Sequence, residues 1–323
     1  MNKKMKAVVL DKPTEAGDVT LCEIPIPKEK PGWVLVKIKA FGMNHSEQIL
    51  RLNEIRADYI RKPIIPGIEC VGEIADPSDS NFTVGQKVVA LMGGMGRSFH
   101  GSYAEYALLP VSHVFAVESA LSWTDMAAIP ETYFTAWGSL FECLCLKPSD
   151  TLLIRGATCA LGYAAIQIAK AIGCTVVATT HKESKLPLLT GVDKAILDTG
   201  KLCDTLNGVT KALELVGPKT LPDTLHCVEK GGIVCNTGIL GGVYTLNGFD
   251  PIKDIPNGVY LTGFFSNYPT EKTMRDIFGF LDKHSLKPAI GASFAFEQIR
   301  NACMALDSGS VNGKIVVTLI KCQ

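Results

Sequence analysis

The sequence predicts an α/β protein in which a β-rich part precedes a doubly wound parallel sheet. Up to about residue 120, short apolar or alternating runs are separated by turn residues, which is typical of strands. From Thr151 onward, strand-like runs alternate with helix-like runs, and this alternation favours a parallel sheet covered by helices. The length of 323 residues agrees with two domains at about 150 residues each.

Composition and charge exclude several classes of protein. The chain has 32 Lys and Arg against 32 Asp and Glu, so its formal net charge is zero. Because phosphate contacts require clustered basic residues, we expect neither a nucleic-acid partner nor an anionic membrane surface. Hydrophobic residues make up 47%, which is enough for a buried core. No apolar run reaches the roughly 18 residues that a membrane span needs.

The cysteines indicate a reducing compartment. There are 11, an odd number, and they are scattered with no CxxC pair. This pattern is unlike a secreted disulfide framework, so we expect free thiols and a cytoplasmic protein. The apolar run near the N-terminus, residues 7–10, is too short for the core of a signal peptide.

The first part of the chain predicts strands and then one long helical segment. The strands are expected at residues 7–10, 34–41, 70–75, 87–92 and 113–117. Residues 121–144 have helical spacing, with Ser122 as the N-cap and Asp125 three residues later. Pro130 is expected to kink or split this helix, because proline lacks the backbone N–H.

The second part predicts the alternating pattern. Strands are expected at 151–156, 175–180, 194–198, 211–217 and 232–238, with helices at 160–173, 183–190 and 220–229. One more strand follows near residue 260, then a helix at 271–283 and a final strand at 313–320.

A tight turn opens the helix after the first of these strands. Residues 157–162 stand where a GxGxxG dinucleotide fingerprint would stand, but only its last glycine is present. The surrounding strand, turn, helix and second strand predict a nucleotide pyrophosphate at the helix N-terminus. Its expected contacts are Thr158, Cys159, Ala160, Leu161 and Gly162. The alternative is an ordinary turn built from small residues.

The end of the second strand favours NADP(H) over NAD(H). An NAD site prefers an acid about 20 residues after the glycines, on the ribose 2′-hydroxyl. Here the first acid is Glu183, and it follows hydroxyl and basic side chains that suit a 2′-phosphate. The residues expected to bind that phosphate are Thr179, Thr180, His181 and Lys185. The alternative is a solvent-exposed helix start with exposed lysines.

Taken together, these motifs resemble the medium-chain dehydrogenase/reductase superfamily and, within it, the zinc-independent quinone oxidoreductases (the ζ-crystallin-like branch). The resemblance covers essentially the whole chain. It rests on segments such as AFGMNHSE (40–47), PGIECVGEI (66–74), LIRGATCALGYAAIQIAKAIG (153–173) and NGKIVV (312–317). It implies a GroES-like β-rich catalytic domain, residues 1–122 and 262–323, plus an inserted Rossmann doubly wound parallel-sheet domain, residues 123–261.

The resemblance also allows the zinc sites to be compared residue by residue. Asn44 stands where zinc alcohol dehydrogenases have a cysteine ligand, and Ile68 stands where they have a histidine. Only Glu131 lies near the place of the third ligand, and residues 92–106 contain no cysteine for a structural zinc. Because tetrahedral zinc needs three or four ligands, we expect no metal at either site.

For the reaction, the resemblance puts Asn44 near the nicotinamide ring, where its amide would bond a quinone oxygen or the cofactor. Thr135 resembles the threonine on the nicotinamide face, and Thr237 and Gly238 follow a strand end that faces the nicotinamide ribose. Tyr133 is a candidate proton donor, as are Glu131 and solvent. The alternatives are a turn residue for Asn44 and a helix-interior threonine for Thr135.

The expected function is therefore NADPH-dependent hydride transfer to a quinone or an activated alkene without a metal. One alternative is a zinc-free alcohol or ketone dehydrogenase, and another is a non-catalytic NADPH-binding sensor. The partner is a small quinone or enone substrate, and relatives imply a homo-oligomer, a dimer or tetramer. The sequence leaves open whether Cys159 is redox-sensitive. A helix N-terminus is expected to lower its pKa, and oxidation there should then block cofactor binding.

Overall fold

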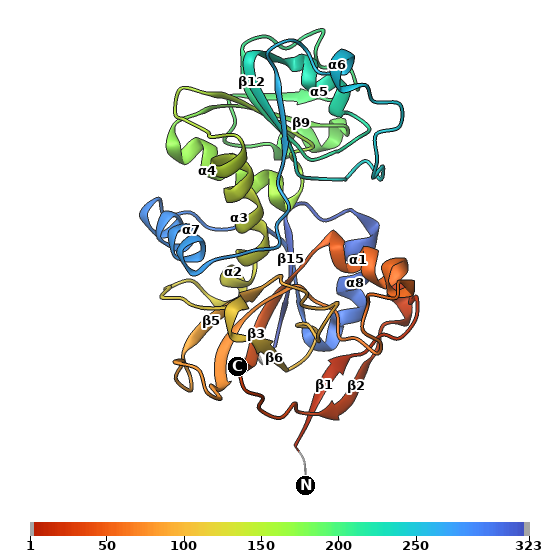
Figure 1. Cartoon of the computed structure of the whole chain (residues 1–323), viewed down its shortest axis with the longest axis vertical. Coiled ribbons are helices and arrows are strands. Elements are labelled where there is room, and N and C mark those ends of the chain that lie inside the picture. The colour runs from red at the N-terminus through yellow and green to blue at the C-terminus, as the bar shows by residue number, and fades with distance from the viewer. Residues whose placement is uncertain (1–2, 320–323) are drawn as a thin grey trace. The chain divides into compact units, whose positions relative to one another are not determined.

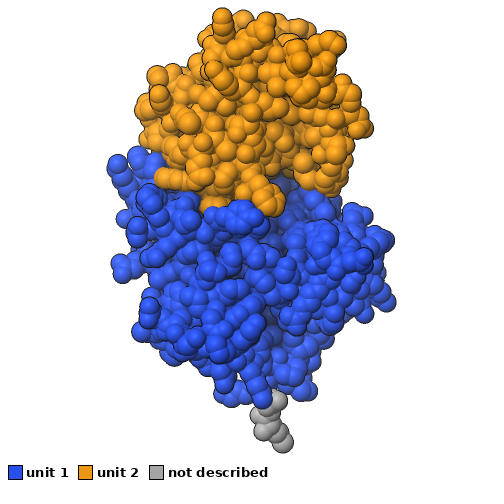
Figure 2. All heavy atoms as spheres, in the orientation of Figure 1, with its two compact units in different colours: residues 1–131, 267–323 blue, residues 132–266 orange. Residues whose placement is uncertain are grey.

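The computed structural model describes residues 3–319, and the chain forms two compact units (Figure 2). Unit 1 comprises residues 1–131 and 267–323, and unit 2 comprises residues 132–266. The β-rich start and the end of the chain thus belong to one unit, and most of the alternating part forms the other.

Unit 1 contains a two-stranded and a seven-stranded sheet (Figure 1). In the smaller sheet, β1 (Lys4–Val8) pairs antiparallel with β2 (Leu21–Pro25). The larger sheet has the order β14-β15-β3-β4-β5-β7, and β6 also pairs with β3. Its strands are β3 (Trp33–Met43), β4 (Glu69–Asp76), β5 (Lys87–Leu91), β6 (Tyr106–Pro110), β7 (Val114–Ala116), β14 (Ile290–Ala295) and β15 (Lys314–Thr318).

Helices and aromatic side chains complete unit 1. Its helices are α1 (His45–Leu52), α2 (Trp123–Ala127), α7 (Glu271–Lys283) and α8 (Ile299–Ser308), with short turns η1 (Ala16–Asp18), η2 (Glu54–Arg56), η3 (Val111–His113) and η6 (Phe296–Gln298). Helix α8 contacts α1, β14 and β15. In the core, the ring of Phe41 stacks on Tyr103 with centroids 4.7 Å apart and meets Phe296 edge-on at 6.0 Å. This packing fixes the end of β3, from which α1 begins.

Unit 2 is built on a six-stranded parallel sheet of order β10-β9-β8-β11-β12-β13. Its strands are β8 (Thr151–Arg155), β9 (Thr175–Thr180), β10 (Lys194–Leu197), β11 (Val209–Glu214), β12 (Val228–Asn236) and β13 (Tyr260–Gly263), and its helices are α4 (Ala160–Ile172), α5 (Leu221–Cys227) and α6 (Pro251–Asp254), with the turn η5 (Glu183–Leu188). Counted in chain order, this is the doubly wound order of a dinucleotide-binding sheet. The predicted fold class is confirmed.

The helical segment at 121–144 is split as expected. Helix α2 ends before Pro130, α3 (Pro130–Trp137) begins at that proline, and a π-helical turn η4 (Gly138–Cys143) follows. The hydroxyl of Ser122 accepts from the backbone N–H of Asp125 at 3.1 Å, which confirms the predicted N-cap. No helix within residues 3–319 has the length and apolar character that crossing a bilayer requires.

Some expectations differ from the structure. The units divide after Glu131 and Ser266, later than the expected limits at 122 and 261, because α2 packs on β3, β4 and β15. The helix expected at 183–190 is the 3-10 turn η5, which contains Pro187. The sequence analysis did not predict α1, α8, β2, β6 or β14.

A buried arginine crosslinks the layers of unit 2. Arg155 ends β8 and is fully buried. Its guanidinium forms two bonds to Asp198, at 2.7 and 2.9 Å, and one to Asp223 on α5, at 2.6 Å. Because the carboxylates are also largely buried, each charge depends on the others for stabilisation.

We predict that Arg155→Met lowers the free energy of unfolding by about 3–5 kcal/mol, because it leaves two buried carboxylates without their cation. The control is Lys170→Met, which removes the half-exposed pair with Asp193 and should cost under about 1 kcal/mol. Urea denaturation followed by circular dichroism measures both. Equal losses in the two variants would contradict the crosslinking role of Arg155.

Candidate functional site

In unit 2, the predicted nucleotide-binding residues gather at one edge of the parallel sheet. The turn after β8, the end of β9 and the residues after β12 all lie at carboxyl ends of strands. Since parallel strands end at the same edge, these three segments share the side where open α/β sheets bind ligands.

The turn after β8 is held closely against β9. The backbone N–H of Ala157 donates to the carbonyl of Thr179 at 2.8 Å, and that of Gly156 donates to its hydroxyl at 3.2 Å. The hydroxyls of Thr158 and Thr180 lie 3.3 Å apart. The structure thus brings together the two segments for which the sequence predicted pyrophosphate and 2′-phosphate contacts.

Helix α4 begins beside this turn. A Cβ added at Gly162 would lie 2.3 Å from the carbonyl oxygen of Ala157, so only glycine allows the helix to approach the turn this closely. Ala160 and Leu161 are the first residues of the helix. The positive end of the helix dipole and its N-terminal backbone N–H groups therefore face the segment that follows β8, an arrangement suited to a phosphate.

Cys159 is the N-cap of α4. The sulfur accepts from the backbone N–H of Gly162 at 3.4 Å. Burial nevertheless raises the pKa of Cys159, and the N–H groups and the charge of Lys185 only partly offset this effect. The expectation of a lowered pKa was wrong, because burial destabilises the thiolate more than the helix terminus stabilises it.

The basic residues after β9 form a cationic segment. His181 is exposed and Lys185 is half-buried, following the buried Thr179 and Thr180. Burial and the neighbouring charge of Lys182 lower the pKa of Lys185. Within residues 3–319, no carboxylate forms an ion pair with Lys185. An anion bound here would stabilise the charged form of Lys185, which burial and the charge of Lys182 disfavour.

Side chains after β12 meet the π-helical turn η4. The hydroxyl of Thr237 lies 2.9 Å from that of Ser139, which in turn donates to the carbonyl of Thr135 at 2.7 Å. The backbone N–H of Gly238 donates to the carbonyl of Glu214 at 3.2 Å. The structure thus links Thr237 to the predicted residue Thr135 through one hydroxyl. The buried Oδ1 of Asn236 has no hydrogen-bond partner within the described residues, so it can accept from a ligand.

Tyr133 is not freely accessible as a proton donor. Its side chain is buried, and its hydroxyl donates to the Oε1 of Gln167 on α4. Burial raises the pKa of Tyr133 well above its usual value. Both features hold the phenol in its neutral form.

In unit 1, Asn44 belongs to a buried ionic cluster. Its Oδ1 accepts from the Nζ of Lys314 at 2.5 Å, and its Nδ2 donates to Oε1 of Glu69 at 2.8 Å. Lys314 and Glu69 form an ion pair at 2.6 Å and are only 2% and 0% exposed. The Oε2 of Glu69 also accepts from the backbone N–H of Glu131 at 2.8 Å, so both carboxylate oxygens are bound.

Strand pairing brings this cluster together. Ile315 of β15 pairs antiparallel with Met43 of β3, so the next residues on each strand, Lys314 and Asn44, lie opposite each other. A Cβ at Gly42 would lie 2.4 Å from Cε of Lys314 and 2.5 Å from Oε1 of Glu69. The absent side chain at Gly42 therefore makes room for the ion pair.

Lys314, Glu69 and Glu47 were not predicted as site residues. The sequence carried a signal for Glu47, since Asn44 and Glu47 have the spacing of a helix capping box. Its Oε2 accepts from the backbone N–H of Asn44 at 2.7 Å and its Oε1 from that of Ile68 at 3.0 Å. No local signal indicates Lys314, because it lies far along the chain from its partners.

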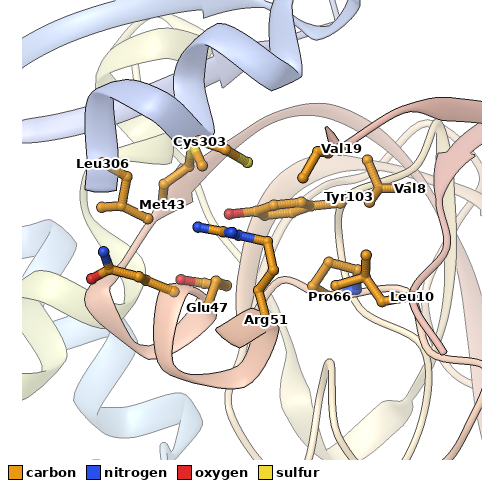
Figure 3. A pocket seen from close by; sticks show the side chains of 11 residues that line it. Val8, Leu10, Val19, Met43, Glu47, Arg51, Pro66, Tyr103, Cys303 and Leu306 are labelled. Carbon is orange, nitrogen blue, oxygen red and sulfur yellow. The ribbon is translucent and has the colours of Figure 1, made fainter. Parts of the chain in front are cut away.

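Glu47 also faces a small cavity, which Figure 3 shows together with Arg51 and Tyr103. The space is about the size of one water molecule. Within residues 3–319, the buried hydroxyl of Tyr103 has no hydrogen-bond partner. Burial raises the pKa of Glu47 to about 7, the charge of Glu69 adds to this, and the N–H groups and Lys314 oppose it.

The comparisons with known proteins agree with this architecture. Residues 30–119 match the family described as "Alcohol dehydrogenase GroES-like domain", and residues 190–317 match the family described as "Zinc-binding dehydrogenase". Together with the fold, these matches identify the class: the chain belongs to the medium-chain dehydrogenase/reductase superfamily of oxidoreductases.

Individual relatives refine this assignment. The chain is 29% identical to the quinone oxidoreductase of Homo sapiens over 92% of its length and 91% of that protein. It is 28% identical to the alcohol dehydrogenase of Geobacillus stearothermophilus, over 98% and 99% of the two chains. A solved structure of an NAD-dependent alcohol dehydrogenase superposes with a TM-score of 0.86 at 25% identity, covering 98% of this chain and 100% of that one. The chain is therefore similar to quinone oxidoreductases and to alcohol dehydrogenases.

The residues of unit 1 do not fit the zinc ion that the second family's description implies. An ammonium already lies against Glu69, Ile68 offers no ligand atom, and both amide atoms of Asn44 are bonded. In the part of the chain that the structure describes, no group of three or more His, Cys, Asp or Glu could hold a metal.

We predict that Glu47 makes wild-type stability fall as the pH rises from about 4.5 to 7. In this range the folded protein keeps a proton on Glu47 that the unfolded chain has lost, so the free energy of unfolding decreases. Relative to Glu47→Gln, the wild type should lose about 3 kcal/mol between pH 4 and pH 8. Urea denaturation at both pH values measures the difference.

Glu54→Gln is the matched control, because hydrogen bonds from Arg97 and Tyr59 hold the pKa of Glu54 below its usual value. A lowered pKa gives stability that is lost as the pH falls, so this control should change in the opposite direction. If the Glu47→Gln difference is independent of pH, the carboxyl does not titrate as described.

Proposed function

We propose that this chain is an NADPH-dependent oxidoreductase that transfers a hydride to a quinone or an α,β-unsaturated carbonyl compound without a metal. The observation that carries the proposal is the Lys314–Glu69 pair at 2.6 Å beside Asn44. With an ammonium in that position, the group that this cluster offers a substrate oxygen is an amide N–H, not a Lewis acid.

The substrate class follows from this weaker polarisation. A simple ketone needs strong stabilisation of the oxygen on which negative charge develops. Quinones and enones accept a hydride at a ring or β-carbon, and conjugation spreads the resulting charge. One amide donor suits such acceptors, and positioning then supplies much of the rate. The similarity to the quinone oxidoreductase of Homo sapiens supports the same class.

The cofactor is proposed to be NADPH. A bound nicotinamide nucleotide supplies the hydride. The N-terminus of α4, from Thr158 to Gly162, would bind its pyrophosphate, and Thr135, Thr237 and Gly238 would contact the nicotinamide half. Thr179, Thr180, His181 and Lys185 would bind the 2′-phosphate, because this segment is cationic and Lys185 forms no ion pair with a carboxylate of the described chain.

Asn44 and Tyr133 are proposed to act on the substrate, and their contacts support them unequally. Asn44 is half-buried and holds a donor N–H near the surface of unit 1. The hydroxyl of Tyr133 already donates to Gln167, and burial raises its pKa. Solvent is therefore the better supported source of the proton that completes the reduction. We also propose that the protein is cytoplasmic and forms a homo-oligomer, a dimer or tetramer.

The test is to analyse the purified protein for metal and then titrate it with NADPH and with NADH. Nucleotide fluorescence reports the binding. We expect a dissociation constant for NADPH at least about tenfold lower, from one charge-assisted phosphate contact. Addition of 1,4-benzoquinone should then remove absorbance at 340 nm, and cyclohexanone should not.

Four results would contradict parts of this proposal. Preference for NADH would contradict the proposed 2′-phosphate site. Stoichiometric zinc in the purified protein would contradict a reaction without a metal. Turnover of cyclohexanone would instead indicate a ketone dehydrogenase. Tight NADPH binding without turnover of quinones or enones would indicate a non-catalytic sensor.

We predict that Lys185→Met raises the dissociation constant for NADPH about tenfold and leaves that for NADH unchanged, because only NADPH carries the 2′-phosphate. Lys201→Met is the control, since Lys201 is an exposed lysine of the same unit outside the proposed site. Equal weakening of both nucleotides by Lys185→Met would show that this lysine does not read the 2′-phosphate.

A further inference from the structure

The amide of Asn44 can take only one orientation in its cluster. An ammonium only donates hydrogen bonds and a carboxylate only accepts them. Oδ1 of Asn44 must therefore face Lys314, and Nδ2 must face Glu69, as the distances of 2.5 and 2.8 Å record. Turning the amide over would place its NH₂ group against the ammonium and its oxygen against the carboxylate.

This orientation leaves one hydrogen-bonding group of the side chain for a ligand. Of the two hydrogens on Nδ2, one is donated to Glu69, and no other partner takes the second within residues 3–319. The backbone N–H of Asn44 is already bonded to Glu47. The half-buried side chain thus presents a donor, while its acceptor is occupied.

The partners that set this orientation cannot leave the cluster easily. Lys314 and Glu69 are buried, and Glu69 accepts from Lys314, from Asn44 and from the backbone of Glu131. Both side chains occupy the space that a Cβ at Gly42 would take, so they pack directly against the backbone of β3. The orientation is therefore established on folding, before any ligand binds.

We propose that Lys314 and Glu69 are positioning residues, which make Asn44 a fixed hydrogen-bond donor for the carbonyl oxygen of the substrate. This inference rests on the proposed function and names the chemistry of its substrate site. The site then prefers groups that accept a hydrogen bond, such as a quinone or enone oxygen. The ammonium on Oδ1 polarises the amide and strengthens its N–H toward an oxygen that gains negative charge during reduction.

The decisive variant is the double substitution Lys314→Met with Glu69→Gln. It removes both charges of the closest pair together, so Glu69 is not left as an unpaired buried charge, and only the longer 4.0 Å contact of Lys314 with Glu131 is lost as well. Circular dichroism of the double variant checks that it is folded. The amide that this variant carries at position 69 can donate or accept, so it no longer dictates the orientation of Asn44. The single variant Lys314→Met leaves Glu69 buried and unpaired. The loss of thermal stability in this variant shows that the ion pair exists.

The first readout does not depend on activity. In the ¹H–¹⁵N spectrum of the full-length protein, the side-chain amide signals of Asn44 are identified by their loss in Asn44→Ala. In the wild type, the hydrogen bonded to Glu69 should exchange slowly and lie downfield. In the double variant both signals should move to ordinary positions and exchange faster. Unchanged signals would overturn the proposal.

The second readout is turnover of 1,4-benzoquinone with NADPH. We expect kcat of the double variant to fall about tenfold, as for one weakened hydrogen bond, with the dissociation constant for NADPH unchanged. Wild-type kcat in a variant whose amide signals have moved would also overturn the proposal. If the wild type has no quinone turnover, the proposed function fails, and the amide signals alone decide whether Asn44 is fixed.

The matched control is Arg51→Met with Asp307→Asn, which removes another ion pair of unit 1, between the buried Arg51 and the half-buried Asp307. Arg51 contacts Asp307 at 2.5 Å and neither residue contacts the side chain of Asn44. This control should leave the Asn44 signals and kcat unchanged. If it moved the signals as far as the decisive variant does, the effect would be a general loosening of unit 1 and the proposal would be wrong.

Discussion

The ion pair between Lys314 and Glu69 is the interaction on which the site of unit 1 depends. Burying an ammonium and a carboxylate is costly, and breaking such a pair by removing one partner costs about 3–5 kcal/mol. The cost is offset here because Glu69 accepts three hydrogen bonds and Lys314 also donates to Asn44. The ends of β3, β4 and β15 must therefore stay together, and the direction of the Asn44 amide follows.

Two carboxyl groups near Asn44 show how environment sets charge. Glu69 lies against an ammonium at 2.6 Å. Glu47 is equally buried but accepts only backbone N–H groups, and burial raises its pKa to about 7. The same residue type thus serves as the anion of an ion pair in one place and as a carboxyl that readily takes up a proton in the other.

In unit 2, the proposed site depends on backbone N–H groups and one lysine. Its parallel strands end at one edge, where the N-terminus of α4 and the basic segment after β9 lie close together. Arg155 is neutralised internally by Asp198 and Asp223, so it is not available to an external phosphate. Lys185 forms no such pair in the described chain, and the proposed 2′-phosphate site on the segment after β9 rests on this difference.

The sequence by itself determined the two kinds of sheet and the turn from Thr158 to Gly162, because periodicity and turn residues are local signals. It also indicated Asn44, through a motif. Only the tertiary structure decided that Lys314, some 270 residues further along, would bond that amide, because antiparallel pairing of β15 with β3 joins distant segments. It also decided the pKa of Cys159, since burial outweighs the helix terminus and burial is a property of the packed fold.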